Sequence, residues 1–588
     1  MHTLPRLFTS LSLLLMSVCF LGAQQRTVNL RILETTDVHG NFFPYNFITR
    51  QPWGGSLARV STYVDSLRMA VGPENVITLD NGDLLQGQPT VYYYNFIDTS
   101  SPHIADEVFR FIGYDAATIG NHDIETGHDV YDRVVAQAPM EILGANVIEK
   151  ASGKPYFKPY TVIERDGAKV AVLGLLTAAI PAWLPETLWE GLEFEDMEES
   201  ARKWIDIIRR DENLDVIIGL FHSGADINKK AGPYVENASL QIARRVPGFD
   251  AVLYGHDHRR YEEMVINTEG KPVVVLNPAN NAMAVADLDV TLTYDGNKLV
   301  DKKVKGRIAD VENLEPNPAY MARFAPQYQA VEKFTTQRIG NARGEFSTRD
   351  AFFGPSAFMS LLHRLQLEIS GADISFAAPL SFDARIAPGS VTMSDMFTLY
   401  KYENMLYTME MTGQEILDYL EMSYDLWINT LDGRKGEHLI KFAEVNPTPQ
   451  NNYLKNPSYN FDSAAGINYT VDVSKPKGKR IKISRLSDGR KFNLKDRYKV
   501  AMNSYRANGG GNHLTEGAGI PASELPRRVV NATDKDLRYY LIERIEKEGD
   551  IVPTVDNNWQ FVPEKYVAPA VALDRQILFS PLSSTNQK

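Results

Sequence analysis

Short apolar, β-branched segments recur through the first half of the chain, and most of them end in a cluster of polar residues. They read VNLRILETTD, NVITLDNGD, AATIGNHD, KVAVLGLLT, DVIIGLFHSGAD, FDAVLYGHDH and PVVVLNPANN. Between the first two, Leu57, Val60 and Val64 recur at the spacing of an amphipathic helix. Strands that alternate with such helices indicate a layered α/β domain whose sheet is covered on both sides.

The polar residues at these predicted strand ends are of the kinds that bind divalent cations. The carboxyl ends of the strands of an open α/β sheet face one crevice, so residues distant in sequence can converge there. Oxygen and nitrogen ligands suit hard-to-borderline metals. One zinc ion takes three protein ligands and a water, so a metal pair about 3.5–4 Å apart explains the set better. The set consists of Asp37, His39, Asp83, Asn121, His122, His222, His256 and His258.

Length and charge narrow the class of protein further. A chain of 588 residues exceeds one hydrophobic core and predicts several domains. With 44% hydrophobic and 23% charged residues, the composition is that of a globular protein. A net charge of −12 argues against a partner that is a nucleic-acid polymer, because such binders need a basic surface. Small anionic substrates are compatible with it, because a metal reverses the sign locally.

The N-terminus has the pattern of an export signal. Arg6 precedes an apolar core over Leu11 to Leu21, and the small-residue end LGA follows. This predicts a signal peptide over residues 1–23, and no later stretch is apolar enough to span a bilayer. The only cysteine, Cys19, lies inside it, so cleavage leaves no thiol; lipid attachment at Cys19 is the alternative, and Val18 before it favours cleavage. We therefore expect an exported protein, in the periplasm or at the cell surface.

The remaining chain divides into two α/β regions. The first is expected over residues 27–312, and the proline-marked segment 313–343 predicts a helical connector. The second is expected over 344–555. In it, FGPSAFMSLLHRLQLEISGADISFAAPL predicts a helix followed by a strand, and YNFDSAAGINYTVDVSKP predicts a strand pair. The last range, 556–588, is predicted to be a C-terminal tail.

The order of the polar blocks resembles that of the calcineurin-like metallophosphoesterases. D-x-H, G-D, G-N-H-[DE], H and G-H-x-H follow one another between about Leu30 and Asn280. The resemblance implies a four-layer αββα domain that holds two divalent ions, which could be zinc, manganese, iron or cobalt. It assigns Asp37, His39, Asp83 and His258 to one metal, and Asp83 as the bridge, Asn121, His222 and His256 to the other.

The second half resembles the C-terminal, substrate-binding α/β domain of 5′-nucleotidases and 2′,3′-cyclic-nucleotide phosphodiesterases. The resemblance rests on GADISFAAPLSF, VTMSDMFTLYKYENMLYTMEMTGQEI, YNFDSAAGINYTVDVSKP and YKVAMNSYRANGGGNH. It implies that two aromatic rings clamp the base, and it places Phe461 and His513 at those positions. It also places Arg385 opposite the substrate. Without the resemblance, Phe461 would be taken as a core aromatic and Arg385 equally well as a surface arginine.

The resemblance also gives a role to the histidine that is left over from the metal set. It implies that His122 points at the substrate, where a histidine with a pKa near neutral can protonate a leaving oxygen. Such a ring needs an acceptor that fixes its tautomer. Glu125 occupies the position of the family's aspartate and is one methylene longer, and Asp123 is the other candidate.

Taken together, the resemblance implies an exported dinuclear-metal phosphoesterase that hydrolyses nucleotides by attack of a metal-bound hydroxide on phosphorus. The segments YNFD and NSYRA favour a 2′,3′-cyclic-nucleotide 2′-phosphodiesterase/3′-nucleotidase. The alternatives are a 5′-nucleotidase or a UDP-sugar hydrolase and, in another class, a non-catalytic surface binding protein, which the complete ligand set disfavours. We expect a monomer whose partner is a small nucleotide.

Overall fold

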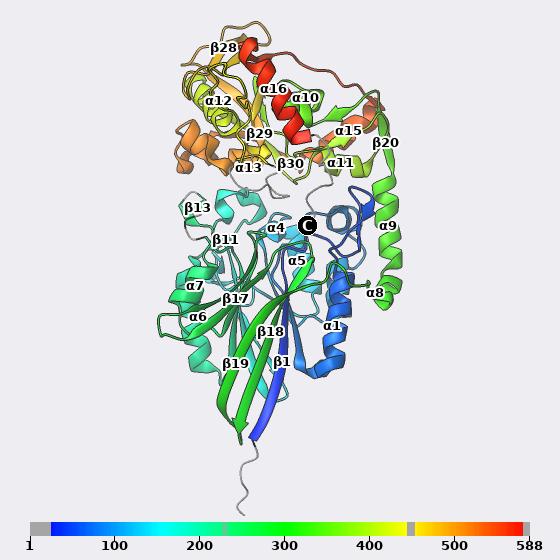
Figure 1. Cartoon of the computed structure of the whole chain (residues 1–588), viewed down its shortest axis with the longest axis vertical. Coiled ribbons are helices and arrows are strands. Elements are labelled where there is room, and N and C mark those ends of the chain that lie inside the picture. The colour runs from blue at the N-terminus through cyan, green and yellow to red at the C-terminus, as the bar shows by residue number, and fades with distance from the viewer. Residues whose placement is uncertain (1–24, 227, 229, 232, 444–452, 580–588) are drawn as a thin grey trace, which may run out of the picture.

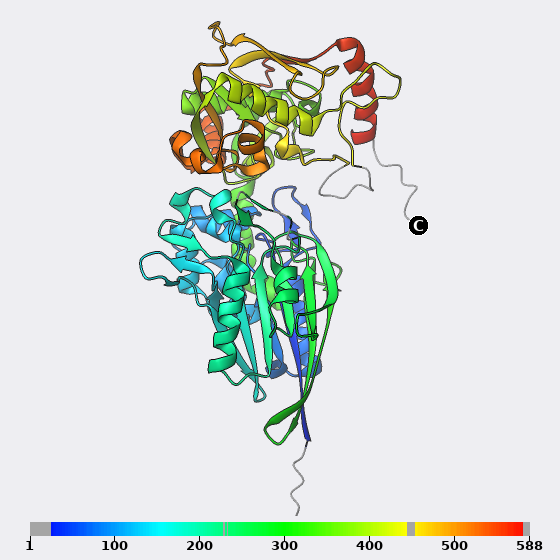
Figure 2. The ribbon, with the colours of Figure 1, turned by 90° about the vertical axis from the view of Figure 1, so that its left-hand side faces the viewer.

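The computed structural model describes residues 25–226, 228, 230–231, 233–443 and 453–579. The predicted signal peptide with Cys19 lies outside the described residues. The chain forms two α/β units stacked along its long axis, the N-terminal unit below and the C-terminal unit above (Figures 1 and 2). Among the helices described, none combines the length and the apolar character that a membrane crossing requires.

The N-terminal unit is built on two six-stranded sheets. In the first, β1, β4, β5 and β6 are parallel, β18 pairs antiparallel with β1, and β19 pairs antiparallel with β18. In the second, β10, β12, β15 and β17 are parallel, with β9 and β16 antiparallel at its edges. The strands of the first are β1 (Gln25–Thr35), β4 (Val76–Asp80), β5 (Ala116–Thr118), β6 (Glu141–Leu143), β18 (Ala284–Asp295) and β19 (Lys298–Asp310). Those of the second are β9 (Tyr160–Arg165), β10 (Ala168–Leu176), β12 (Val216–His222), β15 (Ala251–Tyr254), β16 (Arg260–Ile266) and β17 (Pro272–Pro278).

The two sheets pack face to face and are covered by helices on their outer sides. Ile32 and Leu79 of the first sheet share one buried apolar cluster with Val172 and Leu220 of the second. The first sheet is covered by α1 (Leu57–Val71), α3 (Ile104–Ile112) and α5 (His128–Gln137), and the second by α6 (Met197–Asp211) and α7 (Ser239–Arg245). This order of layers confirms the expected αββα architecture.

Two helices lie in the segment predicted to be the connector. They are α8 (Pro318–Arg323) and α9 (Ala325–Thr336), and α9 runs up the side of the molecule from the lower unit to the upper one (Figure 1). The connector's last residues, Arg338–Ala342, form β20 and already pair with strands of the C-terminal unit.

The C-terminal unit surrounds a five-stranded sheet with the order β26-β22-β29-β25-β30. The predicted helix and strand are present as α10 and β22; the segment predicted as a strand pair forms two strands, β26 and β27, but they lie in different sheets and pair with other strands. The main elements are α10 (Ala357–Ser370), β22 (Ile374–Ala377), α11 (Met393–Leu399), β25 (Met405–Thr412), α12 (Gly413–Trp427), β26 (Ser463–Ala465), β27 (Ile467–Asp472), β28 (Ile481–Leu486), β29 (Arg497–Asn503), α13 (Ser504–Ala507), β30 (Val529–Asp536) and α15 (Leu537–Glu548).

The end of the described chain differs from the predicted tail. Within 556–588, β32 (Trp559–Val562) pairs with β27, and α16 (Glu564–Phe579) follows it. Val567 and Leu578 of α16 are buried in the core of the C-terminal unit. This stretch is therefore part of the unit, because its apolar residues have a core to pack against. Residues 580–588 lie outside the described range, and we keep the other predicted boundaries as a proposal.

Side chains from both units hold them together on the side of α9. Arg50 of the N-terminal unit donates from Nε to Ser394 Oγ at 2.9 Å. The ring of Tyr92 packs edge-on against Phe397 with centroids 5.3 Å apart. The buried guanidinium of Arg538 lies over both rings, at 5.0 Å and 4.1 Å from their centroids. The two units are thus joined by polar and apolar contacts.

Candidate active site

The parallel strands deliver the predicted metal-binding residues to one edge of the two sheets. Asp37 follows β1, Asp83 follows β4, and Asn121 follows β5 and opens α4 (Asn121–Ile124). His222 ends β12, and His256 follows β15. These positions are the carboxyl ends of the strands, which explains why residues so far apart in sequence lie together.

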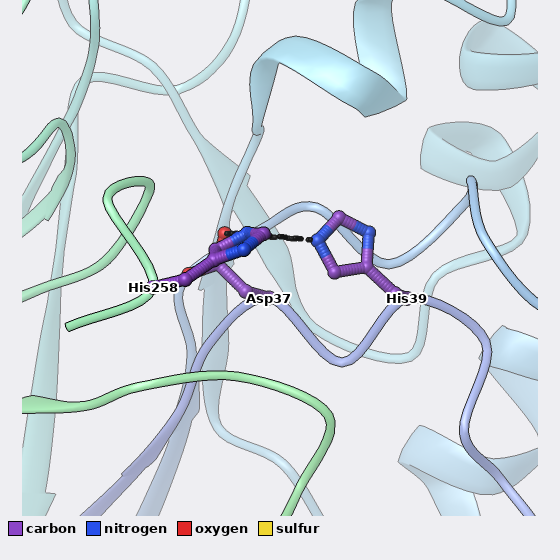
Figure 3. Close-up of side chains that lie close together, drawn as sticks. All are labelled: Asp37, His39 and His258. Atoms are coloured by element: carbon purple, nitrogen blue, oxygen red, sulfur yellow. Dashed lines mark hydrogen bonds and ion pairs between the residues drawn. The ribbon is translucent and has the colours of Figure 1, made fainter. Parts of the chain in front are cut away.

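The first cluster consists of Asp37, His39 and His258, whose side chains converge (Figure 3). Nε2 of His258 lies 3.2 Å from Oδ1 of Asp37. Nε2 of His39 lies 3.1 Å from Nε2 of His258. The ligand atoms of these three side chains therefore surround one small volume.

The second cluster consists of Asp83, His222 and His256, and Asn121 joins it. Nε2 of His222 lies 3.2 Å from Oδ2 of Asp83 and 3.1 Å from Oδ1 of Asn121. Nδ1 of His256 lies 2.7 Å from the same Asn121 oxygen. All seven residues predicted as ligands are thus brought together in two adjacent groups.

The hydrogen bonds around the histidines show which ring nitrogens face the centre of each cluster. Nδ1 of His39 lies 3.0 Å from Gln86 O, and Nδ1 of His222 lies 2.6 Å from Asn81 O. A carbonyl only accepts, so each ring donates from Nδ1 and turns Nε2 inward, where either a proton or a metal can occupy it. There the nitrogens face other acceptors, and the buried Oδ1 of Asp37 has no hydrogen-bond donor. Converging acceptors repel one another unless a cation lies between them, so these residues fit divalent metals.

The backbone is strained at the same places. Non-glycine residues with positive φ are uncommon and cluster at functional sites, at a cost of order 1–3 kcal/mol each. Five of the seven candidate ligands have such a φ: Asp37 (49°), His39 (50°), Asp83 (55°), His256 (74°) and His258 (55°). The fold therefore maintains an unfavourable local conformation in order to aim these side chains.

Glycines in the motifs are required by close approach. A Cβ on Gly120 would lie 2.3 Å from both N and Oδ1 of Asp83. A Cβ on Gly255 would lie 2.4 Å from Oδ2 of Asp37. These two glycines of the G-N-H and G-H blocks thus let neighbouring loops touch at the carboxylates.

The His122 ring is held by Glu125, not by Asp123. Nδ1 of His122 lies 2.5 Å from Oε2 of Glu125, and its backbone N donates to Oδ1 of Asp83 at 2.8 Å. The Asp123 carboxylate instead accepts four backbone N–H groups, those of Asp83, Leu84, Leu85 and Gly120, at 2.8–2.9 Å. Asp123 therefore shapes the loops beneath the clusters, which corrects its predicted role as a candidate partner of His122.

Electrostatics in the metal-free chain are dominated by Asp83. Burial lowers the pKa of His222, but the Asp83 carboxylate outweighs it and raises that pKa to about 10. Burial also disfavours the charged form of His122. The carboxylates of Asp83 and Glu125 favour that form more strongly and raise the pKa of His122 to about 9. Burial and the neighbouring His258 lower the pKa of His39 to about 3. Protons therefore compete with metals for part of this site.

Glu236 and Trp183 contact the site but were not found in the sequence. Oε1 of Glu236 lies 3.2 Å from Nε2 of His256, which leaves Nδ1 of His256 facing Asn121. The Trp183 ring stacks on the same imidazole, with centroids 5.6 Å apart and an angle of 27°. Neither residue directly follows an apolar run, so the signal that marked the ligands was absent.

A cavity of about 1110 Å³ lies between the two units. The N-terminal unit lines it with Asn121, His122, Glu125, Trp183, Glu236 and His256, among others. The C-terminal unit contributes Tyr402, Asn404, Tyr459, Asn503 and Tyr505 and the glycine run that follows Asn508. Asn508 Nδ2 donates to Trp183 O at 3.2 Å and so connects the two walls.

Three residues predicted to contact substrate do not line this cavity. Phe461 is fully buried and stacks on Trp427, with centroids 5.4 Å apart and an angle of 2°. His513 is also fully buried, and its ring nitrogens face the carbonyls of Gly511 and Asn460. The side chain of Arg385 is 62% exposed and pairs with Glu345. Phe461 is thus a core aromatic and Arg385 a surface arginine. These are the interpretations that were expected without the family resemblance.

Two tyrosines occupy the position where those aromatic rings were expected. Tyr459 and Tyr505 are half-buried, line the cavity and lie with ring centroids 6.5 Å apart at an angle of 90°. Both belong to the segments that carried the resemblance, two residues before Phe461 and eight before His513. These segments thus contribute aromatic rings to the cavity wall, although Phe461 and His513 themselves do not line it.

Comparisons with known proteins agree with this architecture. A family model described as calcineurin-like phosphoesterase matches residues 30–260, and one described as 5′-nucleotidase, C-terminal domain, matches residues 335–516. Together these ranges cover most of the chain. The 2′,3′-cyclic-nucleotide 2′-phosphodiesterase/3′-nucleotidase of Yersinia enterocolitica is 25% identical over 92% of this chain and 89% of its own length.

Two further proteins are similar over nearly the same part of the chain. The trifunctional nucleotide phosphoesterase YfkN of Bacillus subtilis is 27% identical over 91% of this chain, which spans 39% of that protein's length. The crystal structure of a putative 5′-nucleotidase from Staphylococcus aureus has a TM-score of 0.74 and 22% identity. It covers 91% of this chain and 99% of its own, and at this identity it supports the fold alone.

Proposed function

The chain belongs to the calcineurin-like phosphoesterases that carry a 5′-nucleotidase C-terminal domain, and we propose that it cleaves 2′,3′-cyclic nucleotides and 3′-nucleotides. Membership of this family makes it a metal-dependent hydrolase of nucleotide phosphoesters. The observation that carries this proposal is the single cavity shared by the two units. Asn121 and His256 of the second metal-type cluster line one wall together with His122, and two tyrosine rings line the other. Such a cavity suits a ligand with a phosphate at one end and a flat base at the other.

The proposed division of labour follows from the residues on each wall. Two divalent ions held by the seven clustered residues would act as Lewis acids toward the phosphate and the attacking water. The chain orients the reaction through Glu125, which keeps Nδ1 of His122 protonated and leaves Nε2 to carry a proton to the leaving oxygen. On the opposite wall, Tyr459 and Tyr505 lie at 90° to each other, so one ring would stack on the face of the base and the other would contact it edge-on.

The choice among nucleotides rests on the extent of similarity. The relative named for cyclic-nucleotide and 3′-nucleotide hydrolysis covers 92% of this chain, whereas protein UshA of Escherichia coli covers 77% at 23% identity. A 5′-nucleotidase activity stays the second candidate, because a Vibrio cholerae protein named 5′-nucleotidase is 24% identical over 68% of this chain. Export from the cell is also part of the proposal, and it rests on the predicted leader over residues 1–23.

The test compares 2′,3′-cyclic AMP, 3′-AMP and 5′-AMP side by side, each with added zinc, manganese, iron or cobalt. We expect kcat/KM for the first two to exceed that for 5′-AMP by at least about tenfold, which corresponds to about 1.4 kcal/mol of transition-state binding. The reverse order would make the protein a 5′-nucleotidase. Absence of turnover with every metal would support a binding protein on the same fold.

A further inference from the structure

Two segments that are far apart in sequence supply the tyrosine pair. Tyr459 lies in a short turn, Ser458–Asn460, and Tyr505 lies in α13. Two rings at 90° can contact one flat base together, one on its face and one edge-on, and a separation that is fixed before the base binds avoids the loss of affinity that ordering the rings would cost. A buried ion pair whose two residues do not line the cavity links these two segments.

The link begins with a buried ion pair. Arg506, the neighbour of Tyr505, places Nε 2.8 Å from Oδ2 of Asp462, and the two residues are only 3% and 4% exposed. The contact is an ion pair without hydrogen-bond geometry at Nε. Tyr419 donates its hydroxyl to the same carboxylate oxygen. A charge this deeply buried needs its partner, so the position of Arg506 depends on Asp462.

The other nitrogens of Arg506 reach both tyrosine-bearing segments. Nη2 donates to the carbonyl of Tyr459 at 2.8 Å, and Nη1 donates to the carbonyl of Gly510. One planar guanidinium thus connects the turn that carries Tyr459 with the glycine run that follows α13. His513 adds a parallel link, because its Nε2 lies 3.0 Å from Asn460 O and its Nδ1 lies 2.9 Å from Gly511 O.

The glycine run fits tightly around this arrangement. A Cβ on Gly510 would lie 2.5 Å from Cζ of Tyr505, and a Cβ on Gly511 would lie 2.2 Å from Nη1 of Arg506. Gly511 also has a φ of 69°, which favours glycine. The run therefore packs directly against the Tyr505 ring and the guanidinium. A shift of Arg506 would move the glycine run and, with it, the Tyr505 ring.

We propose that Arg506 and Asp462 are positioning residues that fix the spacing of Tyr459 and Tyr505 and thereby set the affinity for the nucleoside part of the substrate. Neither residue lines the cavity, so both act through the tyrosines. The inference rests on the proposed nucleotide function. A lysine at position 506 would keep the charge, but its compact ammonium cannot reproduce the planar fork that bonds two carbonyls beside a carboxylate.

The test measures two inhibition constants with the metal-loaded full chain during hydrolysis of 4-nitrophenyl phosphate. Adenosine probes the tyrosine wall, and inorganic phosphate probes the metal wall. In Arg506→Lys we expect the inhibition constant of adenosine to rise by about 5- to 100-fold, the usual worth of base stacking, and that of phosphate to change far less. Asp462→Asn, which keeps the side-chain shape and an oxygen for Tyr419, is the second variant and should show the same selective loss.

The matched control is Arg480→Lys. Arg480 is 4% exposed in the same unit and places Nη1 3.1 Å from Oδ1 of Asp425, but it does not line the cavity. We expect it to lower thermal stability without changing the adenosine constant. Equal effects of Arg506→Lys and Arg480→Lys on adenosine, or equal loss for adenosine and phosphate in Arg506→Lys, would overturn the inference.

Two tyrosine variants separate failure of the inference from failure of the proposed function. If Tyr459→Ala and Tyr505→Ala leave the adenosine inhibition constant unchanged, the cavity has no base subsite at these tyrosines. The proposed binding of a nucleotide by both walls of the cavity would then be wrong. If these variants weaken adenosine while Arg506→Lys and Asp462→Asn do not, the base subsite stands and only the positioning role of the ion pair is wrong.

Discussion

His122 combines two properties that suit a general acid. Its Nδ1 is engaged by Glu125 at 2.5 Å, and its ring lines the cavity beside the two metal-type clusters. Its backbone N–H, in turn, is held by Asp83 at 2.8 Å. The side chain is thus oriented by one carboxylate and its backbone anchored by another, which leaves Nε2 as the proton-carrying atom.

Replacement of His122 by alanine tests this role. His122→Ala should keep its metals but lower kcat by about 10²–10⁴ for substrates with a poor leaving group, the usual worth of general acid–base catalysis. The loss should shrink for 4-nitrophenyl phosphate, whose leaving group needs little protonation. His128→Ala is the control, because His128 lies nearby in sequence but bonds to Asp132 and Glu190 away from the cavity. A loss independent of the leaving group, measured by steady-state kinetics, would remove His122 from this role.

The raised pKa of His222 predicts a pH dependence of the metal-free protein. With a folded pKa of about 10 against 6.5 for the free side chain, the protonated ring stabilises the fold fully below about pH 6.5. This contribution is lost as the pH rises toward 10. The opposing lowered pKa of Asp83 matters only in acid, where stability is lost as the pH falls. Chelator-treated protein should therefore lose thermal stability between pH 6.5 and 10.

The control for this dependence is His222→Asn, which removes the titrating ring. Calorimetric scans should show a smaller decline of Tm with pH in the variant than in the unaltered chain. Parallel declines would mean that other groups cause it. Because a metal must displace the same proton, metal affinity should also rise over this pH range.

At the residue scale, the sequence predicted which metal-type residues lie together, but not which aromatic rings line the cavity. Asp37, Asp83 and His222 follow apolar runs directly, and the carboxyl ends of parallel strands converge by geometry alone. The side chains of Tyr459 and Phe461 differ in direction because Tyr459 lies in a tight turn, Ser458–Asn460, and Phe461 is the residue that follows it. Which ring faces the core was decided by the packing of Phe461 on Trp427, a contact that no local pattern reveals.

At the scale of elements, local patterns identified the helices and strands that build the cavity walls. The helix-strand pattern that became α10 and β22 was readable because its apolar spacing changes from helical to strand-like. The C-terminal helix α16 was missed although Val567, Ala570 and Leu578 have helical spacing. A terminal segment is expected to fray unless something holds it, and β32, which fixes α16 in place, pairs with a strand distant in sequence.

At the scale of the whole molecule, the cavity exists because two units meet in one arrangement. Arg50 donates to Ser394 and lies 3.7 Å from Oδ2 of Asp395, while Tyr92 packs against Phe397. These contacts join residues before the connector to residues after it and hold the N-terminal unit opposite the unit that carries the tyrosines. The sequence divided the chain in two but contained no signal for this orientation, since it depends on side chains from separate units.

Loss of the Arg50 contact should loosen this arrangement. The side chain is 40% exposed, so Arg50→Ala should cost about 1 kcal/mol and lower kcat/KM for 3′-AMP about fivefold. Small-angle scattering should show a larger radius of gyration. Arg110→Ala, which removes an exposed ion pair within the N-terminal unit, serves as the control. Unchanged scattering and kinetics in Arg50→Ala would show that the remaining contacts suffice to hold the units.

The most direct test of the dinuclear centre is the metal content of the purified chain and of Asp83→Asn, measured by elemental mass spectrometry together with turnover. Asp83 belongs to the second cluster, with Oδ2 3.2 Å from Nε2 of His222 and Oδ1 accepting from the backbone N of His122, and its charge also acts on Asp37 and His39 of the first cluster. The account predicts two bound divalent ions per unaltered chain, one for each cluster. In Asp83→Asn it predicts fewer than two ions and loss of phosphoesterase turnover. Full metal content with near-normal turnover in that variant would contradict it.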